Sequence, residues 1–170
     1  MMASQPVEPI PHSIREVSDD ISAGRYETLR VRETIAHLAH EGSWKELWDV
    51  ADMMSKEVSV LFDLTGRIWV DIGTAGQVRL SPPMGAKVPF RLWVHTHPWD
   101  AYWSTTDLGT LASSSRILDE AIVLGHDHFK RASKRRSDNE TLSPSGPLSS
   151  WSSESCLPYP QFETGGDAVG

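Results

Sequence analysis

The feature that most constrains the fold is a change of hydrophobic period just before Glu57. In S-W-K-E-L-W-D-V-A-D-M-M-S, residues 43–55, apolar side chains recur at i, i+3, i+4 and i+7 from Trp44. This spacing predicts an amphipathic helix with one buried face. Ser43 and Glu46 have the spacing of a capping box, which predicts the helix start. From Glu57, E-V-S-V-L-F-D-L is rich in β-branched and aromatic residues, as strands are. A helix therefore leads directly into a β-sheet.

The residues that follow predict the rest of that sheet. Thr65-Gly66 is a turn signal, so R-I-W-V-D-I should pair with the preceding strand as a hairpin. Further along we expect a short strand at 77–81, a Pro- and Gly-containing loop at 81–89, a buried strand at 90–97, a helix at 105–118 and a strand at 120–125. The order helix, hairpin, strand, helix, strand predicts an α/β fold of the α+β kind, with a mixed sheet flanked by helices.

Composition separates a folded domain from two tails. Residues 1–12 are polar with three prolines, which predicts a disordered N-terminus. The folded domain should span 13–136, beginning with a helical stretch over 13–40. Residues 137–170 are dense in Ser, Pro and Gly and predict a flexible tail. The basic run K-R-A-S-K-R-R at 130–136 is either a solvated helix end or a contact site for an acidic partner.

Charge and cysteine content narrow the class of protein. The net charge of −7 argues against a nucleic-acid-binding protein, which is usually basic. The single cysteine, Cys156, excludes a disulfide framework within one chain and a cysteine-based zinc site. We find no signal peptide and no apolar run near the roughly 20 residues that cross a bilayer. We therefore expect a soluble, cytoplasmic protein that binds neither nucleic acid nor membrane.

H-T-H-P, residues 95–98, is the pattern that carries chemistry. Side chains alternate faces along a strand, so His95 and His97 should point the same way, with Cα atoms about 6.5–7 Å apart. Two neutral imidazoles at this separation can bind one metal ion, commonly zinc. Pro98 should end the strand, since it cannot donate to a sheet ladder.

The third candidate ligand is Asp107, in the first turn of the helix that follows. A carboxylate there suits the positive end of the helix dipole and can face the strand end. Two histidines and one carboxylate, with water in the fourth position, form a known catalytic zinc arrangement. The alternative is structural, because Ser104 and Asp107 also have capping-box spacing and His-x-His pairs occur in strands without metal.

Taken together, H-T-H-P, a spacer and S-T-T-D resemble the signature of the JAMM (MPN-plus) metalloproteases, and the likeness covers about residues 28–130. The resemblance implies an MPN-like, cytidine-deaminase-like fold and a zinc-dependent peptidase or isopeptidase of the single-domain prokaryotic kind. The substrate it implies is a protein or peptide, in some relatives a ubiquitin-like one. Zinc ligands would be His95, His97 and Asp107, with Ser104 as hydrogen-bond donor to the oxyanion.

The family also uses a glutamate as general acid and base at the start of a strand. Glu57 holds that place, and Asp63 and Asp71 on the hairpin are its rivals. The sequence departs from the family pattern in two ways. The spacer W-D-A-Y-W between Pro98 and Ser104 is about one residue short, and Val58, Ser59 and Val60 stand where the family tends to have glycine.

Other features leave alternatives open. Gly125-His126-Asp127-His128 is a second His-x-His pair without a third ligand at familiar spacing, which favours a polar loop over a second metal site. Aromatic residues Trp99, Tyr102 and Trp103 either form an apolar wall for a substrate or pack the short loop. A non-catalytic MPN-fold scaffold and a metal hydrolase of another class are the alternative functions. The sequence does not indicate an oligomeric state.

Overall fold

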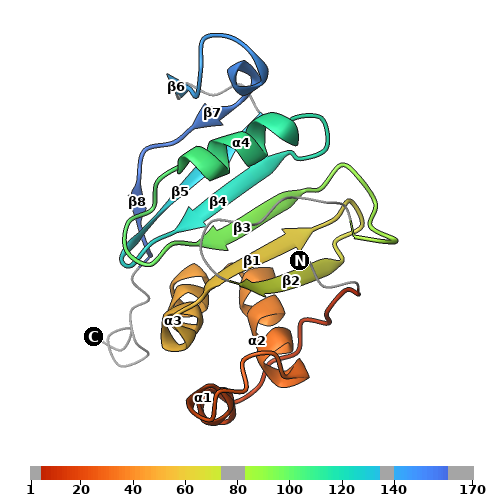
Figure 1. The fold of residues 1–170 in the computed structure, drawn as a ribbon, viewed down its shortest axis with the longest axis vertical. Coiled ribbons are helices and arrows are strands. Elements are labelled where there is room, and N and C mark those ends of the chain that lie inside the picture. The colour runs from red at the N-terminus through yellow and green to blue at the C-terminus, as the bar shows by residue number, and fades with distance from the viewer. Residues whose placement is uncertain (1–4, 74–82, 135–139, 161–170) are drawn as a thin grey trace, which may run out of the picture.

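The computed structural model describes residues 5–73, 83–134 and 140–160. Among these residues, three helices precede the first strand, and a fourth helix lies between two strands of a mixed sheet (Figure 1), which confirms the predicted α/β class. In chain order the elements are α1 (Ile14–Ser22), α2 (Leu29–His40), α3 (Trp44–Met54), β1 (Glu57–Phe62), β2 (Ile68–Gly73), β3 (Leu92–Thr96), α4 (Thr105–Ser113), β4 (Glu120–Leu124), β5 (His128–Ser133), β6 (Glu140–Thr141), the 3-10 helix η1 (Pro147–Ser150), β7 (Ser152–Ser153) and β8 (Leu157–Pro158).

One mixed sheet organises the molecule, in the order β2-β1-β3-β4-β5-β7-β6, with β8 also paired to β5. Strands β3 and β4 are parallel, and the other pairs are antiparallel. A parallel pair needs a crossover connection, and α4 supplies it between β3 and β4. The candidate ligands therefore lie on the strand and helix of this crossover.

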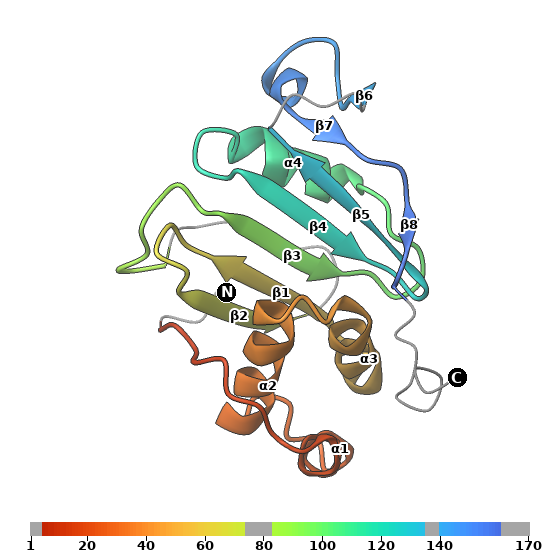
Figure 2. The same cartoon turned by 180° about the vertical axis from the view of Figure 1, so that it is seen from behind.

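The two faces of the sheet carry different cores. Helices α1, α2 and α3 pack on one face against Val58, Val60 and Val94. Helix α4 crosses the other face, where Leu61 and Trp93 belong to a second apolar cluster. Figures 1 and 2 show α4 and the three N-terminal helices on opposite sides of the strands. Because side chains alternate along a strand, His95 shares the α4 face with Trp93.

Local sequence explains most of the helix boundaries. Helices α1 and α2 are separate because the chain turns at Gly24, which has a φ of 78° that favours glycine. The side chain of Asp20 accepts hydrogen bonds from Arg25, Thr28 and Arg30 and joins the two helices. Helix α3 begins where predicted, but the Ser43 side chain makes no capping hydrogen bond. The predicted strand at 77–81 lies outside the described residues.

Two expectations about the chain ends differ from the structure. Residues 140–160 are not a flexible tail, because β7 and β8 pair with β5 and Trp151 is fully buried. Its indole N–H donates to Leu111 O at 3.1 Å. At the other end, Val7 is buried and its N–H donates to Ile68 O at 2.7 Å, so part of the segment predicted to be disordered packs on β2. Two contacts between residues that are distant in the sequence hold in place segments whose composition suggested disorder.

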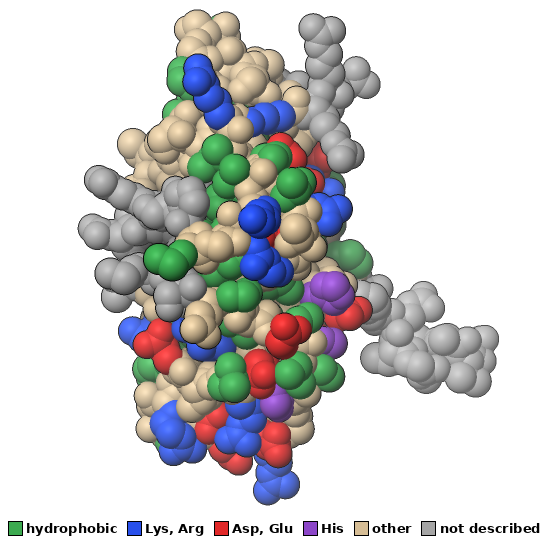
Figure 3. Space-filling view, turned by 90° about the vertical axis from the view of Figure 1, so that its right-hand side faces the viewer, with side chains coloured by type: hydrophobic (Ala, Val, Ile, Leu, Met, Phe, Trp, Pro, Cys, Tyr) green, Lys and Arg blue, Asp and Glu red, His purple; other side chains and the backbone are tan. Residues whose placement is uncertain are grey.

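The basic run at 130–136 is also not a helix end over its described part, since β5 continues to Ser133. Its charges lie on a strand, where Arg131 pairs with Glu120 at 2.9 Å. Acidic and basic side chains are interspersed over the described part of the face in Figure 3. No large patch of one charge is visible among the described residues of that face.

Candidate metal centre

Backbone contacts on both sides fix the strand end that carries the two histidines. His95 pairs with Val123 of β4 and with Ser59 of β1. Beyond β3, the His97 N–H donates to Leu124 O, and His97 O accepts from the Trp48 indole N–H, both at 2.8 Å. Both rings are consequently held on one face, as the alternation predicts.

A capping box fixes the carboxylate that faces them. Ser104 Oγ accepts the Asp107 N–H at 3.0 Å, and Asp107 Oδ2 accepts the Ser104 N–H at 3.0 Å. The structural interpretation of Ser104 and Asp107 is therefore confirmed. It does not compete with a ligand role, since a carboxylate has about four acceptor positions on its two oxygens and capping uses one.

The three candidate ligands come together in a buried cluster. Asp107 Oδ1 lies 3.1 Å from His95 Nε2, and Asp107 Oδ2 lies 3.0 Å from His97 Nε2. One nitrogen or oxygen from each residue lies within 4.8 Å of the others, and the residues are 5%, 7% and 6% exposed. Ligand atoms of a tetrahedral zinc ion with bonds near 2.05 Å are about 3.3 Å apart, so little movement would close the site on an ion.

His95 gives the test of whether a metal ion fits. Neither its Nδ1 nor its Nε2 makes a hydrogen bond among the described residues, although both are buried. The contact to Asp107 has the length of a hydrogen bond but not its geometry. Leaving buried polar atoms unpaired costs free energy. A cation between His95 Nε2 and the Asp107 carboxylate would give both of these groups a partner. The His-His-Asp set fits a metal ion.

Electrostatics at Asp107 favour the charged carboxylate. Burial raises the pKa of Asp107, but the imidazoles of His95 and His97 and the Ser104 N–H outweigh this and hold the pKa well below its usual range. A metal ligand must be deprotonated. Asp107 therefore meets this requirement at neutral pH.

The three aromatic residues of the loop have different surroundings. Trp99 and Tyr102 are 73% and 54% exposed, and Tyr102 meets the His97 ring edge-on at 4.8 Å. Trp103 packs against the α4-face cluster and donates its indole N–H to Ser153 Oγ at 2.9 Å. Trp99 and Tyr102 are thus exposed to solvent near the candidate ligands, while Trp103 packs the loop.

Glu57 lies on the same side of the sheet as the histidines. Ser59 pairs with His95, and Glu57 lies two residues before Ser59 on β1, so the alternation of side chains directs Glu57 to the same face as Ser59. Glu57 and His97 also line one cavity of about 350 Å³, with Trp48 and Trp99. Glu57 therefore lines the same cavity as one candidate ligand.

The two rival acids have other surroundings. Asp63 is fully buried, and its carboxylate accepts hydrogen bonds from Thr65, Arg67 and the Lys87 N–H. Burial raises the pKa of Asp63, but these hydrogen bonds have the larger combined effect and lower it to about 2. Asp63 is therefore a structural residue of the turn. Asp71 pairs with Ser59 from β2, one strand farther from His95, and burial raises its pKa.

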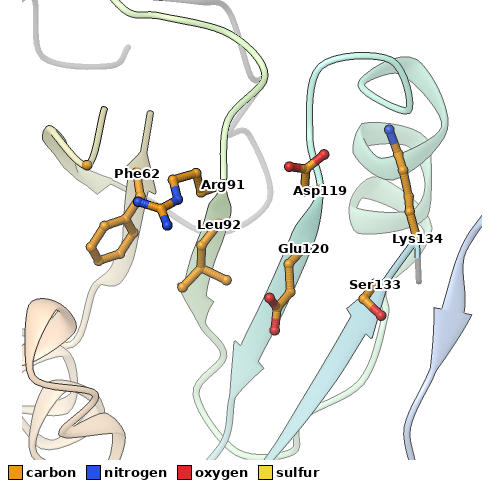
Figure 4. A pocket seen from close by; sticks show the side chains of 8 residues that line it. Phe62, Arg91, Leu92, Asp119, Glu120, Ser133 and Lys134 are labelled. Atoms are coloured by element: carbon orange, nitrogen blue, oxygen red, sulfur yellow. The ribbon is translucent and has the colours of Figure 1, made fainter. Parts of the chain in front are cut away.

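A larger cavity of about 550 Å³ lies at the opposite end of β3 and β4 (Figure 4). Arg91, Asp119 and Lys134 surround it at the strand ends, while Phe62 and Glu120 line its floor. None of the three candidate ligands lines this cavity, so its size alone does not make it the reactive site.

The second His-x-His pair does not form a metal cluster among the described residues. His126 lies in the turn between β4 and β5, and His128 begins β5. The His128 Nε2 accepts the Ala101 N–H at 2.9 Å. No local sequence pattern predicts this contact, because it joins the loop after β3 to the first residue of β5, 27 positions farther along the chain.

Within the described residues, no helix is long and apolar enough to cross a membrane. Comparisons with protein-family models, with curated proteins and with solved structures give no match for this chain. The interpretation of the site therefore depends on the motif and on its geometry.

Proposed function

We propose that this chain is a zinc-dependent hydrolase of the JAMM type that cleaves an amide or isopeptide bond in a protein or peptide substrate. The observation that carries the proposal is the buried convergence of His95, His97 and Asp107 beside a cavity that Glu57 lines. When bound, the ion would supply a water of lowered pKa and polarise the scissile carbonyl oxygen. Zinc is favoured because two imidazoles and a carboxylate with an open position suit it well.

The chain's own residues would have distinct tasks. Glu57, which lines the same cavity as His97, would take a proton from the attacking water and deliver it to the leaving nitrogen. Ser104 accepts one hydrogen bond at its hydroxyl, and a hydroxyl also has a proton to donate. That proton would stabilise the oxyanion, because negative charge develops there as the carbonyl is attacked. Trp99 and Tyr102 would contact the substrate chain near the cavity mouth.

The test compares two variants, in each of which a neutral amide replaces an acidic side chain on the same face of the sheet. Glu57→Gln removes the proposed general base, whereas Asp71→Asn removes a carboxylate one strand farther away. We expect Glu57→Gln to lower kcat by about 10²- to 10⁴-fold with zinc retained, and Asp71→Asn to keep most of the activity. Suitable probes are a ubiquitin C-terminal amide fluorophore and a mixed peptide library.

The metal content of all three proteins is measured by elemental analysis alongside activity. Equal activity of Glu57→Gln and wild type would remove Glu57 from the mechanism. A zinc-loaded wild type that cleaves none of the probes would support the alternative, a non-catalytic scaffold. A wild type that takes up no divalent ion would refute the proposed hydrolase.

A further inference from the structure

The loop Pro98–Trp103, which joins the histidine strand to the aspartate helix, is held by two segments that contribute no candidate ligand. We call it the metal loop. One segment is the β4–β5 turn, Gly125–His128, and the other is the C-terminal arm, Trp151–Tyr159. The sequence predicts other roles for both segments, a polar loop and a flexible tail.

The β4–β5 turn holds the middle of the metal loop through a histidine of defined tautomer. The Ala101 N–H donates to His128 Nε2 at 2.9 Å, so this nitrogen is unprotonated. The proton of the neutral ring is then on Nδ1, which lies 2.5 Å from Asp127 Oδ1. Asp127 therefore orients the His128 ring, and this ring in turn positions the metal loop. Carboxylates orient histidine rings around metal sites in the same way.

The same turn also approaches the metal loop backbone closely. The His126 N–H donates to Trp99 O at 2.6 Å. A Cβ added to Gly125 would lie 2.6 Å from Ala101 N and 2.7 Å from Trp99 O. Only glycine allows this approach, so the loop and the turn form one packed unit.

The C-terminal arm holds the end of the loop and the helix beyond it. Trp103 donates its indole N–H to Ser153 Oγ at 2.9 Å, directly before the capping residue Ser104. Farther along α4, Leu111 O accepts the Trp151 indole N–H at 3.1 Å. The arm therefore contacts the chain on both sides of Asp107.

We propose that His128 and Ser153 are positioning residues for the metal centre, which they influence through Ala101 and Trp103. This inference deepens the proposed function, since it concerns the same three ligands. Anchors at Ala101 and Trp103 set where Ser104 caps α4, and the cap sets where the Asp107 carboxylate points.

The experiment compares two substitutions of His128 with one of Ser153. In His128→Gln the side-chain oxygen can replace Nε2 as acceptor, whereas His128→Leu fills similar space without an acceptor. We expect zinc affinity, measured by chelator competition on the full chain, to fall about tenfold in His128→Leu and severalfold in Ser153→Ala. His128→Gln should stay within about twofold of wild type.

A second measurement does not depend on zinc. In the metal-free proteins, amide hydrogen exchange at Ala101 should be faster in His128→Leu than in wild type and nearly unchanged in His128→Gln. Unfolding midpoints are recorded for each variant, so that global destabilisation is recognised as faster exchange throughout the sheet.

The outcomes separate this inference from the proposed function. Wild-type affinity in His128→Leu and Ser153→Ala, with unaltered exchange at Ala101, overturns the positioning role and leaves the hydrolase standing. Equal losses in His128→Leu and His128→Gln overturn it as well. A wild type that binds no zinc refutes the hydrolase, while exchange at Ala101 still decides whether the turn orders the loop.

Discussion

The two His-x-His pairs of this chain have the same spacing and opposite surroundings. His95 and His97 point to one face at the end of β3, where Asp107 meets them from the next helix. His126 and His128 flank a turn, and the neighbouring Asp127 is largely exposed. The difference shows that the spacing is not sufficient. The first pair is a candidate metal centre because a strand aligns its two rings and an acid on a separate element faces them.

Trp48 touches both pairs. Its indole N–H donates to His97 O, and its ring meets the His126 ring edge-on at 5.1 Å. Trp48 thus links the second pair to the first, and the second pair has a structural role. Three comparisons, each between two variants, test this difference in role.

The largest effect is expected from alanine at equivalent positions of the two pairs. His97→Ala removes a ligand, so zinc affinity should fall by more than about 100-fold, beyond the loss typical of groups outside the ligand set. His126→Ala removes only ring contacts with Trp48 and Trp99 and should bind zinc nearly as wild type does. Chelator competition measures both. Equal affinities in the two variants would erase the distinction drawn here.

The close approach of the turn to the metal loop predicts the next largest effect. Gly125→Ala places a methyl group against the backbone of Trp99 and Ala101, and we expect a loss of about 1–3 kcal/mol in the free energy of unfolding. Gly109→Ala is the matched control, because a Cβ there meets nothing within 4 Å inside α4. The control should stabilise the protein by about 0.5–1 kcal/mol. Urea unfolding gives both values, and destabilisation by the control or tolerance of Gly125→Ala would contradict the model.

Phenylalanine in place of tryptophan should give the smallest effect. Trp48→Phe leaves the buried His97 carbonyl without its indole donor, while Trp69→Phe removes an indole N–H that has no acceptor among the described residues. Both lose ring volume, so their difference reports the hydrogen bond. We expect Trp48→Phe to cost about 1 kcal/mol more in unfolding free energy. A larger loss for Trp69→Phe would show that the bond to His97 O adds little.

Local patterns predicted much of the fold. The helical face from Trp44, the hairpin after Glu57 and the capping box at Ser104 depend on neighbours in sequence and are present in the structure. The meeting of His95, His97 and Asp107 could also be expected, because a strand and the helix that follows it bring them together within a few residues.

What the sequence did not predict depends on contacts between distant segments. Trp151 is buried because it reaches Leu111 on α4, and its Ser- and Pro-rich surroundings conceal this. Lys130 and Arg131 gave β5 the composition of a solvated helix end, although Phe129 and Ala132 are buried in the sheet. The bond from Ala101 to His128 links residues 27 positions apart, which no local pattern encodes.

The crossover through α4 has a consequence for the order of folding and metal binding. All three candidate ligands lie between residues 95 and 107, so an ion bound there would close only a short loop and remove little chain entropy. The sheet and its two apolar clusters already hold that segment in place. A metal ion at this candidate site should therefore bind to a chain that has already folded, whereas small zinc domains fold only when zinc binds.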